Sequence, residues 1–230
     1  MADEDAPIDD VKGHRSRLRA RLLGHGGDAL QDYELIEYLL GLATPRYDTK
    51  PLAKLLMREF GSIGGVLTAN PDALLRVKGL GDISVAAIKI AQATAIRLLY
   101  SEVAARPVLA NWQALLDYLR ARMAHEVIEQ FRVLHLDTKN KLIQDEEMSR
   151  GTNDQAPVYV RKVISRALEL ESAAIILVHN HPSGDPSPSR ADIEITRTIA
   201  DAGKRLGITV HDHIIMGTAG HVSLRAQGLI

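Results

Sequence analysis

The sequence predicts an α/β domain with a mixed sheet flanked by helices in its second half, preceded by a small all-helical domain. Helical apolar spacing fills the first half, the character changes after Arg106-Pro107, and strand-like segments then alternate with helical ones. The 230 residues, 46% of them hydrophobic, suffice for two cores. We therefore expect a disordered acidic tail at 1–11, a helical domain at 12–106 and an α/β domain at 108–230.

The helical domain follows from apolar periodicity and from stop and start signals. Apolar residues at helical spacing predict helices over 14–23, 30–42 and 50–60, with Asp32 as the N-cap of the second. Asn70 followed by Pro71 is a cap with proline at the first helical position, and another helix is expected from about 84 to 100. Between these last two helices, Gly79-Leu80-Gly81 predicts a tight turn of helix-hairpin-helix type.

The second domain begins with a predicted helix over 111–124. Alternating residues at 131–137 and 141–149 predict a hairpin that turns at 138–140. A helix over 160–170, a buried apolar strand over 173–179 and a helix over 189–206 follow, and two final strands are expected at 207–217 and 221–228. This alternation of strands and helices predicts a mixed sheet.

Composition limits the classes of function. The chain has no cysteine, which excludes disulfides and zinc sites with thiolate ligands. The formal net charge is −1, so no global basic field indicates nucleic acid, although residues 11–107 alone carry +5. No stretch approaches the roughly 18 apolar residues of a membrane span, and the acidic N-terminus does not resemble a secretory signal. We expect a cytoplasmic protein that does not bind membranes.

One stretch, at 179–192, carries residues suited to metal chemistry: HNHPSGDPSPSRAD. His179 and His181 are two apart at the end of a predicted strand, so both rings can enter one pocket. Asp192 follows one turn into the next helix. Two imidazoles and a carboxylate suit zinc, with a fourth position open for water. The alternative is structural, because Ser189 and Asp192 also fit a capping box that starts the helix.

The same stretch resembles the JAMM motif of JAB/MPN-type zinc metallohydrolases, which reads His-x-His-Pro, six residues, Ser, two residues, Asp. A wider frame resembles one branch, the RadC family, in FRVLHLDTKNKLI, ALELESAAIILVHNHPSGDPSPS and HDHIIMG. With the front helices included, the resemblance covers nearly the whole chain after the acidic tail. It implies a C-terminal MPN (JAB-like) fold, and the family is associated with DNA repair.

The resemblance also implies roles for individual residues. His179, His181 and Asp192 would bind Zn²⁺, and Ser189 would help to stabilise an oxyanion. The catalytic glutamate of the family lies at the start of an earlier strand, where Glu129 is the best match. Glu126, three residues upstream, is the alternative, because the motif itself does not fix this position.

Two other segments resemble metal-binding motifs without matching them. Residues 125–129, HEVIE, nearly match the H-E-x-x-H of helical zinc proteases, but the last position is Glu129. His211 and His213 form a second His-x-His with no carboxylate at a comparable distance. We expect these two to be core residues or to orient a metal ligand.

The first expected function is a zinc-dependent metalloprotease or isopeptidase, which cleaves an amide or isopeptide bond of a peptide or protein with metal-activated water. The second is a DNA-associated binding module with a structural or vestigial zinc site. In that case Gly79, Leu80 and Gly81 would present backbone N–H groups to a DNA phosphate. Asp82, directly after the glycines, is an unfavourable neighbour for phosphate, and a plain helix–turn–helix corner is the structural alternative.

Overall fold

The computed structural model describes residues 8–151 and 158–230, and the chain divides into two compact units, Met1–Ala95 and Ile96–Ile230. The boundary of the two units lies inside a helix, ahead of the change of sequence character at Arg106-Pro107. Residues 1–7 of the expected acidic tail lie outside the described residues. The first helix begins at Ile8, within the segment assigned to that tail.

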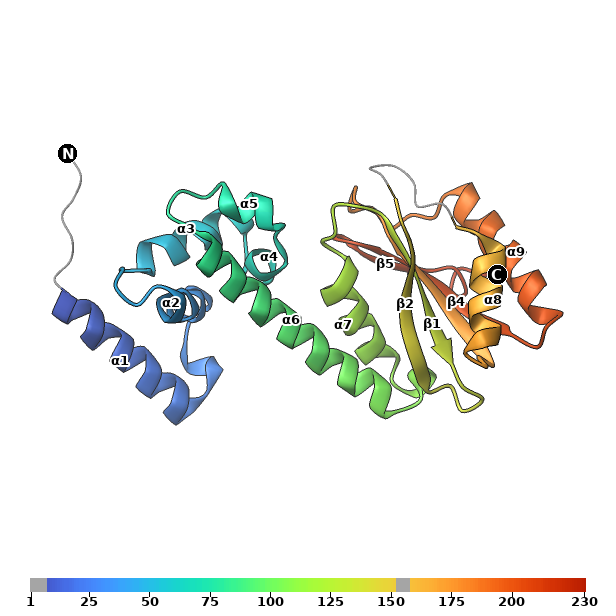
Figure 1. Ribbon diagram of the computed structural model, residues 1–230, viewed down its shortest axis with the longest axis horizontal. Helices are drawn as coiled ribbons and strands as arrows, with labels where there is room; N and C mark the ends of the chain where they lie inside the picture. Colours follow the sequence, from blue (N-terminus) through green and yellow to red (C-terminus); the bar gives the residue numbers. More distant parts are fainter. Residues whose placement is uncertain (1–7, 152–157) are drawn as a thin grey trace. The chain divides into compact units, whose positions relative to one another are not determined.

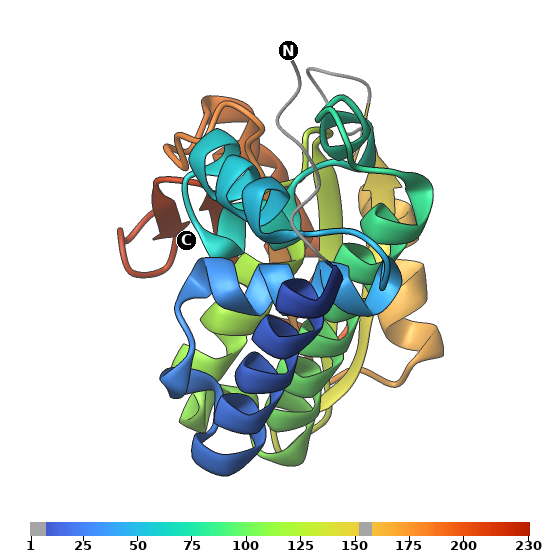
Figure 2. The same cartoon turned by 90° about the vertical axis from the view of Figure 1, so that its left-hand side faces the viewer.

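The first unit is helical throughout its described part (Figures 1 and 2). Its elements are α1 (Ile8–His25), a 3₁₀ turn η1 (Gly27–Ala29), α2 (Asp32–Ala43), α3 (Lys50–Phe60), α4 (Ile63–Thr68), α5 (Pro71–Leu75) and the first part of α6 (Asp82–Ala105). Fully buried aliphatic side chains from these helices form its core, including Leu40, Leu56 and Ile88.

The structure corrects one local prediction in this unit and adds one helix that the sequence did not predict. The N-cap of α2 is Gln31, not Asp32, because Gln31 and Glu34 form a reciprocal capping box and Asp32 is the first helical residue. The short helix α4 was not predicted, because its six residues include two glycines. It is capped instead by the Ser62 side chain, which accepts a hydrogen bond from the Gly65 N–H.

Helix α6 belongs to both units. Val85 and Ile88 near its start are buried in the first core, whereas Val103 near its end is buried in a core of the second unit. Among the described residues it is the one helix long and apolar enough to cross a membrane by length and composition, although only 17% of its most apolar window is buried. A single helix of this kind is weak support for a membrane span, and its two ends contribute to hydrophobic cores.

The second unit contains a five-stranded mixed sheet in the order β2-β1-β3-β4-β5. The strands are β1 (Gln130–Leu136), β2 (Leu142–Arg150), β3 (Ala174–Asn180), β4 (Thr209–Gly217) and β5 (Gly220–Ser223). Only the β3–β4 pair is parallel; the other neighbours are antiparallel. The last predicted strand, 221–228, is shorter than expected, because Asp212 holds Ser223 and the Arg225 N–H and the chain turns there.

Helices cover both faces of this sheet (Figure 1). A short 3₁₀ turn η2 (Val108–Ala110) leads into α7 (Trp112–Met123), which packs with the even-numbered core residues of β1 and β3. Helices α8 (Val160–Glu169) and α9 (Arg190–Lys204) pack with the odd-numbered ones. The predicted α/β class with a mixed, helix-flanked sheet after a helical region is confirmed, and β3 is buried on both faces at its centre.

Candidate metal centre

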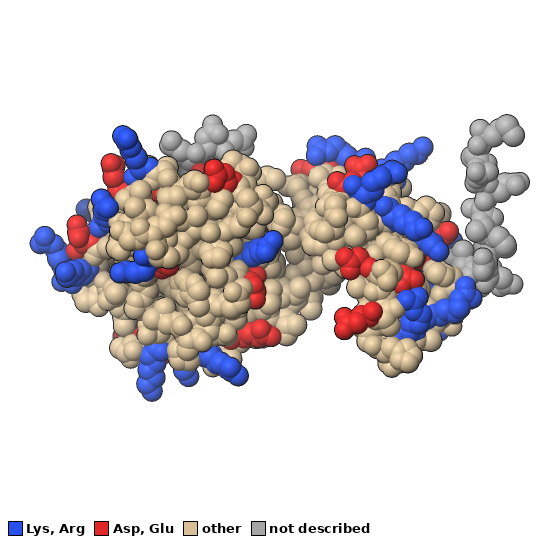
Figure 3. Space-filling view, turned by 180° about the vertical axis from the view of Figure 1, so that it is seen from behind, with Lys and Arg blue, Asp and Glu red and all other residues tan. Residues whose placement is uncertain are grey.

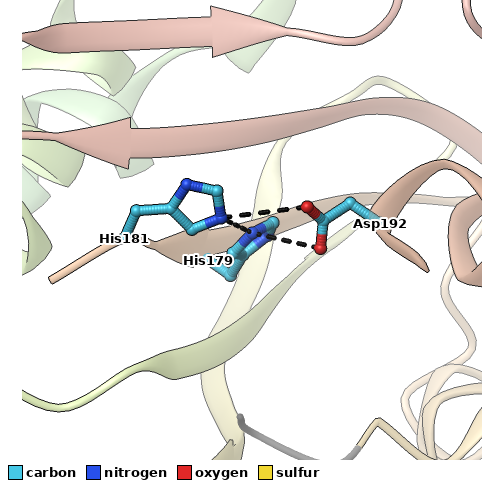
Figure 4. A group of neighbouring side chains, drawn as sticks. All are labelled: His179, His181 and Asp192. Atoms are coloured by element: carbon cyan, nitrogen blue, oxygen red, sulfur yellow. Dashed lines mark hydrogen bonds and ion pairs between the residues drawn. The ribbon is translucent and has the colours of Figure 1, made fainter. Parts of the chain in front are cut away.

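The stretch at 179–192 forms a cluster at the carboxyl end of β3 (Figure 4). His179 is the penultimate residue of β3, and His181 follows the strand. Asp192 lies in the first turn of α9. One ligand atom from each of the three residues lies within 4.8 Å of the other two. The fold thus brings together the three residues that the sequence predicts as zinc ligands.

The three side chains face one another through their free ligand atoms. The Nε2 atoms of His179 and His181 are 3.0 Å apart. The Oδ1 atom of Asp192 is 3.4 Å from the His179 Nε2, and its Oδ2 atom is 3.8 Å from the His181 Nε2. Small adjustments would bring all three within the roughly 2.0–2.2 Å at which nitrogen and oxygen bind zinc.

The other nitrogen of each ring has its own partner. His181 Nδ1 lies 2.8 Å from the backbone oxygen of Asp185, which can only accept, so Nδ1 carries the proton. His179 Nδ1 lies 2.8 Å from His213 Nε2. Which of these two nitrogens donates is decided by the partner of the other His213 nitrogen.

Thr196 is that partner. Its hydroxyl donates to the backbone oxygen of Asp192, one turn earlier in α9, and the hydroxyl oxygen of Thr196 also contacts His213 Nδ1. Because the hydroxyl has a single proton, it must accept from His213 Nδ1–H. His213 Nε2 then has a lone pair, which accepts from His179 Nδ1–H. These assignments leave a lone pair on Nε2 of both His179 and His181.

The donor set therefore fits a divalent cation. Two imidazole lone pairs and an anionic carboxylate converge on one point, and the inferred tautomers place no proton between the two rings. Such a cluster is repulsive alone and becomes favourable around a positive charge. Nitrogen and oxygen donors with hydrogen-bonded outer nitrogens are typical of zinc sites in proteins.

Burial keeps the central imidazole neutral, as a metal ligand must be. The His179 side chain is 2% exposed, and burial lowers its pKa to about 4, with the Asp192 carboxylate partly opposing the shift. Burial likewise lowers the pKa of His213. Both rings are therefore uncharged near pH 7 and can hold the tautomers described above.

The start of α9 reconciles the two interpretations of Ser189 and Asp192. The Ser189 Oγ accepts from the Asp192 N–H at 3.1 Å, and the Asp192 Oδ2 accepts from the Ser189 N–H at 2.7 Å, which completes the capping box. The cap fixes the carboxylate while its Oδ1 still faces His179. Because the Ser189 hydroxyl accepts in this cap, its own proton is left for another partner.

The two candidate glutamates differ in their surroundings. Glu129 directly precedes β1, and Phe131, two residues later, pairs with His179. Strand alternation therefore puts Glu129 on the same face of the sheet as His179. The Glu126 carboxylate instead contacts the Gln130 amide at 2.9 Å and Arg150 at 3.2 Å. Its position beside Gln130 directs it to the other face, so of the two glutamates Glu129 lies on the face that carries His179.

His211 and His213 are not part of the cluster formed by His179, His181 and Asp192. His211 contacts the side-chain oxygen of Asn140 at 2.6 Å. His213 contacts and orients His179, which is one of the two roles expected for it. The sequence did not indicate which of the candidate ligands it would contact. Thr196 and Asn180 were not singled out from the sequence. The position of Thr196 one helical turn after Asp192 is the only signal that could have indicated it.

The glycine turn lies in the first unit. Gly79 has a left-handed φ of 94°, Leu80 is buried, and α6 begins at Asp82. The turn lines a pocket of about 710 Å³ with Asp48 and Asp82 among its residues. Lysines, arginines and acids intermingle over both units on the face in Figure 3. That face carries no surface dominated by basic residues, as judged from the described residues.

A mixed, helix-flanked sheet with a His-x-His and aspartate cluster at the end of its central strand defines a JAB-type domain with a candidate metal centre. Residues 109–229 match the family model of the RadC-like JAB domain, and residues 10–86 match that of the UPF0758 N-terminal region. The chain belongs to the RadC family.

Two relatives match this chain over nearly their whole length. The UPF0758 protein of Rhodobacter capsulatus is 54% identical over 93% of this chain and 100% of its own. The UPF0758 protein of Ruegeria pomeroyi is 50% identical over 96% of this chain and 98% of its own. Both units are therefore shared with these relatives.

Proposed function

We propose that this protein is a cytoplasmic, zinc-dependent hydrolase of the JAMM type that cleaves an amide or isopeptide bond in a peptide or protein. The observation that carries the proposal is the convergence of two imidazole lone pairs and one carboxylate at the end of β3. The RadC-like JAB match supports the same class of chemistry. The family's association with DNA repair suggests that the substrate belongs to that process.

Each residue has a distinct task in this proposal. His179, His181 and Asp192 would hold the ion, which would act as a Lewis acid and make water more acidic. Glu129 takes a proton from the attacking water and delivers it to the leaving amine. The Ser189 hydroxyl, whose proton is not used by the helix cap, donates to the oxyanion of the tetrahedral intermediate.

Two measurements test the proposal. The purified chain should contain about one zinc ion, and His179→Ala should lose it, because one of three ligands is removed. Glu129→Gln should retain the zinc and lose about 100-fold or more of its turnover on a panel of fluorogenic peptide and isopeptide substrates. The matched variant Glu126→Gln should keep that turnover. Zinc-free wild-type protein, or equal turnover by Glu129→Gln, would contradict the assignment.

One feature favours a second function, DNA binding by the first unit. The glycine turn directly precedes the N-terminus of α6, and a Cβ atom added at Gly81 would meet no other atom within 4 Å, so a backbone phosphate could approach. Filter binding with duplex DNA over a salt series tests this, because phosphate contacts strengthen at low salt. Lack of binding at low salt would exclude it, and Gly81→Glu should weaken any binding observed.

A further inference from the structure

Asn180, the residue between the two histidines, is nearly fully buried, at 1% exposure. It is the last residue of β3, so its side chain points to the opposite face of the strand from the imidazole of His179. A buried amide must find partners for one acceptor oxygen and two donor hydrogens. All three of its hydrogen bonds go to one short segment of backbone.

That segment runs from 126 to 130 and contains Glu129. The Asn180 Oδ1 accepts from the Gln130 N–H at 2.8 Å. Its Nδ2 donates to the backbone oxygens of Glu126 and Ile128, at 3.2 Å each. These groups flank residue 129 on both sides. Between α7 and β1 the chain is irregular, so the backbone has few ladder partners there, and Asn180 supplies them.

The backbone of residue 129 is held from the other side as well. Its carbonyl accepts from the Gly151 N–H, just after β2, at 2.9 Å. The segment is therefore held between β3 and the end of β2. No other residue type of this size offers an acceptor and two donors in one plane, so asparagine suits the position by its chemistry.

We propose that Asn180 is a positioning residue that fixes Glu129 relative to the candidate metal centre. One side of the β3 terminus supplies the ligand His179, and the other side holds the backbone that carries the glutamate. The distance between His179 and Glu129 is then fixed by two adjacent residues of β3, His179 itself and Asn180. The inference rests on the proposed function for its catalytic meaning, but its structural part can be tested without metal.

The first test uses amide hydrogen exchange of the full-length, metal-free chain, wild type and Asn180→Leu. Loss of all three bonds should raise exchange in a peptide covering 126–131 by at least about tenfold, relative to a peptide from β4. Asn180→Asp, which keeps the acceptor but turns a carboxylate oxygen towards the two carbonyl oxygens, should also raise exchange in this peptide. The control Asn111→Leu, whose amide bonds a carbonyl in α6, should leave 126–131 unchanged. Equal exchange of 126–131 in wild type and Asn180→Leu would overturn the proposal.

The second test separates positioning from general stability. Glutamates are labelled with ¹³C at the carboxyl, and Co²⁺ is added as a paramagnetic probe of the candidate centre; Glu129→Gln identifies the signal of residue 129. In wild type this signal should be shifted and broadened, and in Asn180→Leu at least half of the effect should be lost while Co²⁺ affinity stays within about threefold. An unchanged effect on Glu129 would overturn the proposal. Failure of the wild type to bind Co²⁺ would refute the metal centre, while the exchange comparison still decides the role of Asn180.

Discussion

At the scale of single residues, the centre depends on where a few protons lie. Imidazole binds a metal only through a nitrogen without a proton. The hydrogen-bond partner of the other nitrogen therefore decides whether the metal-facing nitrogen has a free lone pair. For His181 that partner is the Asp185 carbonyl, and for His179 it is His213 backed by Thr196. The hydroxyl of Thr196 thus influences a candidate ligand, His179, that it does not touch.

Thr196→Val should weaken zinc binding by about tenfold or more, because the variant removes the acceptor that orients His213. The matched control is Thr198→Val, since the Thr198 hydroxyl makes the same type of bond to a carbonyl one turn earlier on the same helix. Competition titration with a chromogenic chelator measures both affinities. Equal affinities for the two variants would show that the Thr196 hydroxyl does not orient the ligand.

A second residue makes stability depend on pH. His135 in β1 is fully buried, and burial lowers its pKa to about 4. The unfolded chain, with a histidine pKa near about 6.5, takes up this proton first, so stability falls as the pH drops from about 6.5 towards 4. Between pH 7 and pH 5 this residue alone should account for about 2 kcal/mol of lost stability.

Urea unfolding of wild type and His135→Gln at both pH values measures this contribution. The variant should lose about 2 kcal/mol less than wild type between pH 7 and pH 5, whatever its absolute stability, because glutamine does not titrate. The same loss in both proteins would mean that His135 does not titrate differently on folding.

At the scale of elements, the loop after β3 is held against the hairpin of β4 and β5. The His181 N–H donates to the Met216 carbonyl at 2.8 Å, and the Ala219 N–H donates to the Gly184 carbonyl at 3.1 Å. A Cβ atom at Gly217 would lie 2.3 Å from that same Gly184 carbonyl oxygen. Only glycine permits this approach, which holds the Asp185 carbonyl beside His181.

Gly217→Ala should therefore displace the loop, weaken zinc binding by about tenfold and destabilise the fold by about 1–3 kcal/mol. Gly24→Ala is the control, because a Cβ atom there meets nothing within 4 Å and zinc binding should not change. Chelator competition and thermal unfolding give the two quantities. Zinc affinity in Gly217→Ala equal to that of wild type would show that the loop does not need this contact.

At the scale of the whole molecule, the boundary between the two compact units does not coincide with the point where the sequence changes from helical to mixed character. The units divide between Ala95 and Ile96, and the sequence changes after Pro107. Val103, near the end of α6, is 1% exposed and packs in the core that α7 shares with the sheet. Partly buried residues of α6, including Leu99 and Tyr100, pack against the same core. The second unit therefore includes the last turns of α6, although the sequence changes character only after them.

A fragment of residues 96–230 should be more stable than a fragment of residues 108–230, by about 2–3 kcal/mol, because the shorter one exposes the apolar surface that α6 covers. Thermal unfolding of both fragments, each with and without zinc, measures the difference. Equal melting temperatures would place the edge of the folding unit at the start of the α/β segment instead.

The sequence alone determined the order of most elements, because apolar periodicity and caps are local. Helix α3 has the predicted bounds, and β1 and β3 each lie within one residue of theirs. The spacing of the sequence, together with its resemblance to the JAMM motif, also indicated which three residues meet at the end of β3, since His179 is the penultimate residue of the strand, His181 directly follows it and Asp192 lies one loop away. The N-cap of α2 was misplaced by one residue because Gln31 and Asp32 are adjacent polar residues. Helix α4 was missed because its glycines do not indicate a helix.

Only the tertiary structure decided what surrounds those three residues. His213 and Thr196 come from β4 and α9, and their contact with His179 depends on the parallel pairing of β3 with β4 and the packing of α9 on the sheet. The side of the sheet on which Glu129 lies depends on the β1–β3 register, and Asn180 holds the backbone on both sides of Glu129. A local pattern can place ligands within one segment, but contacts between distant segments exist only once the chain has packed.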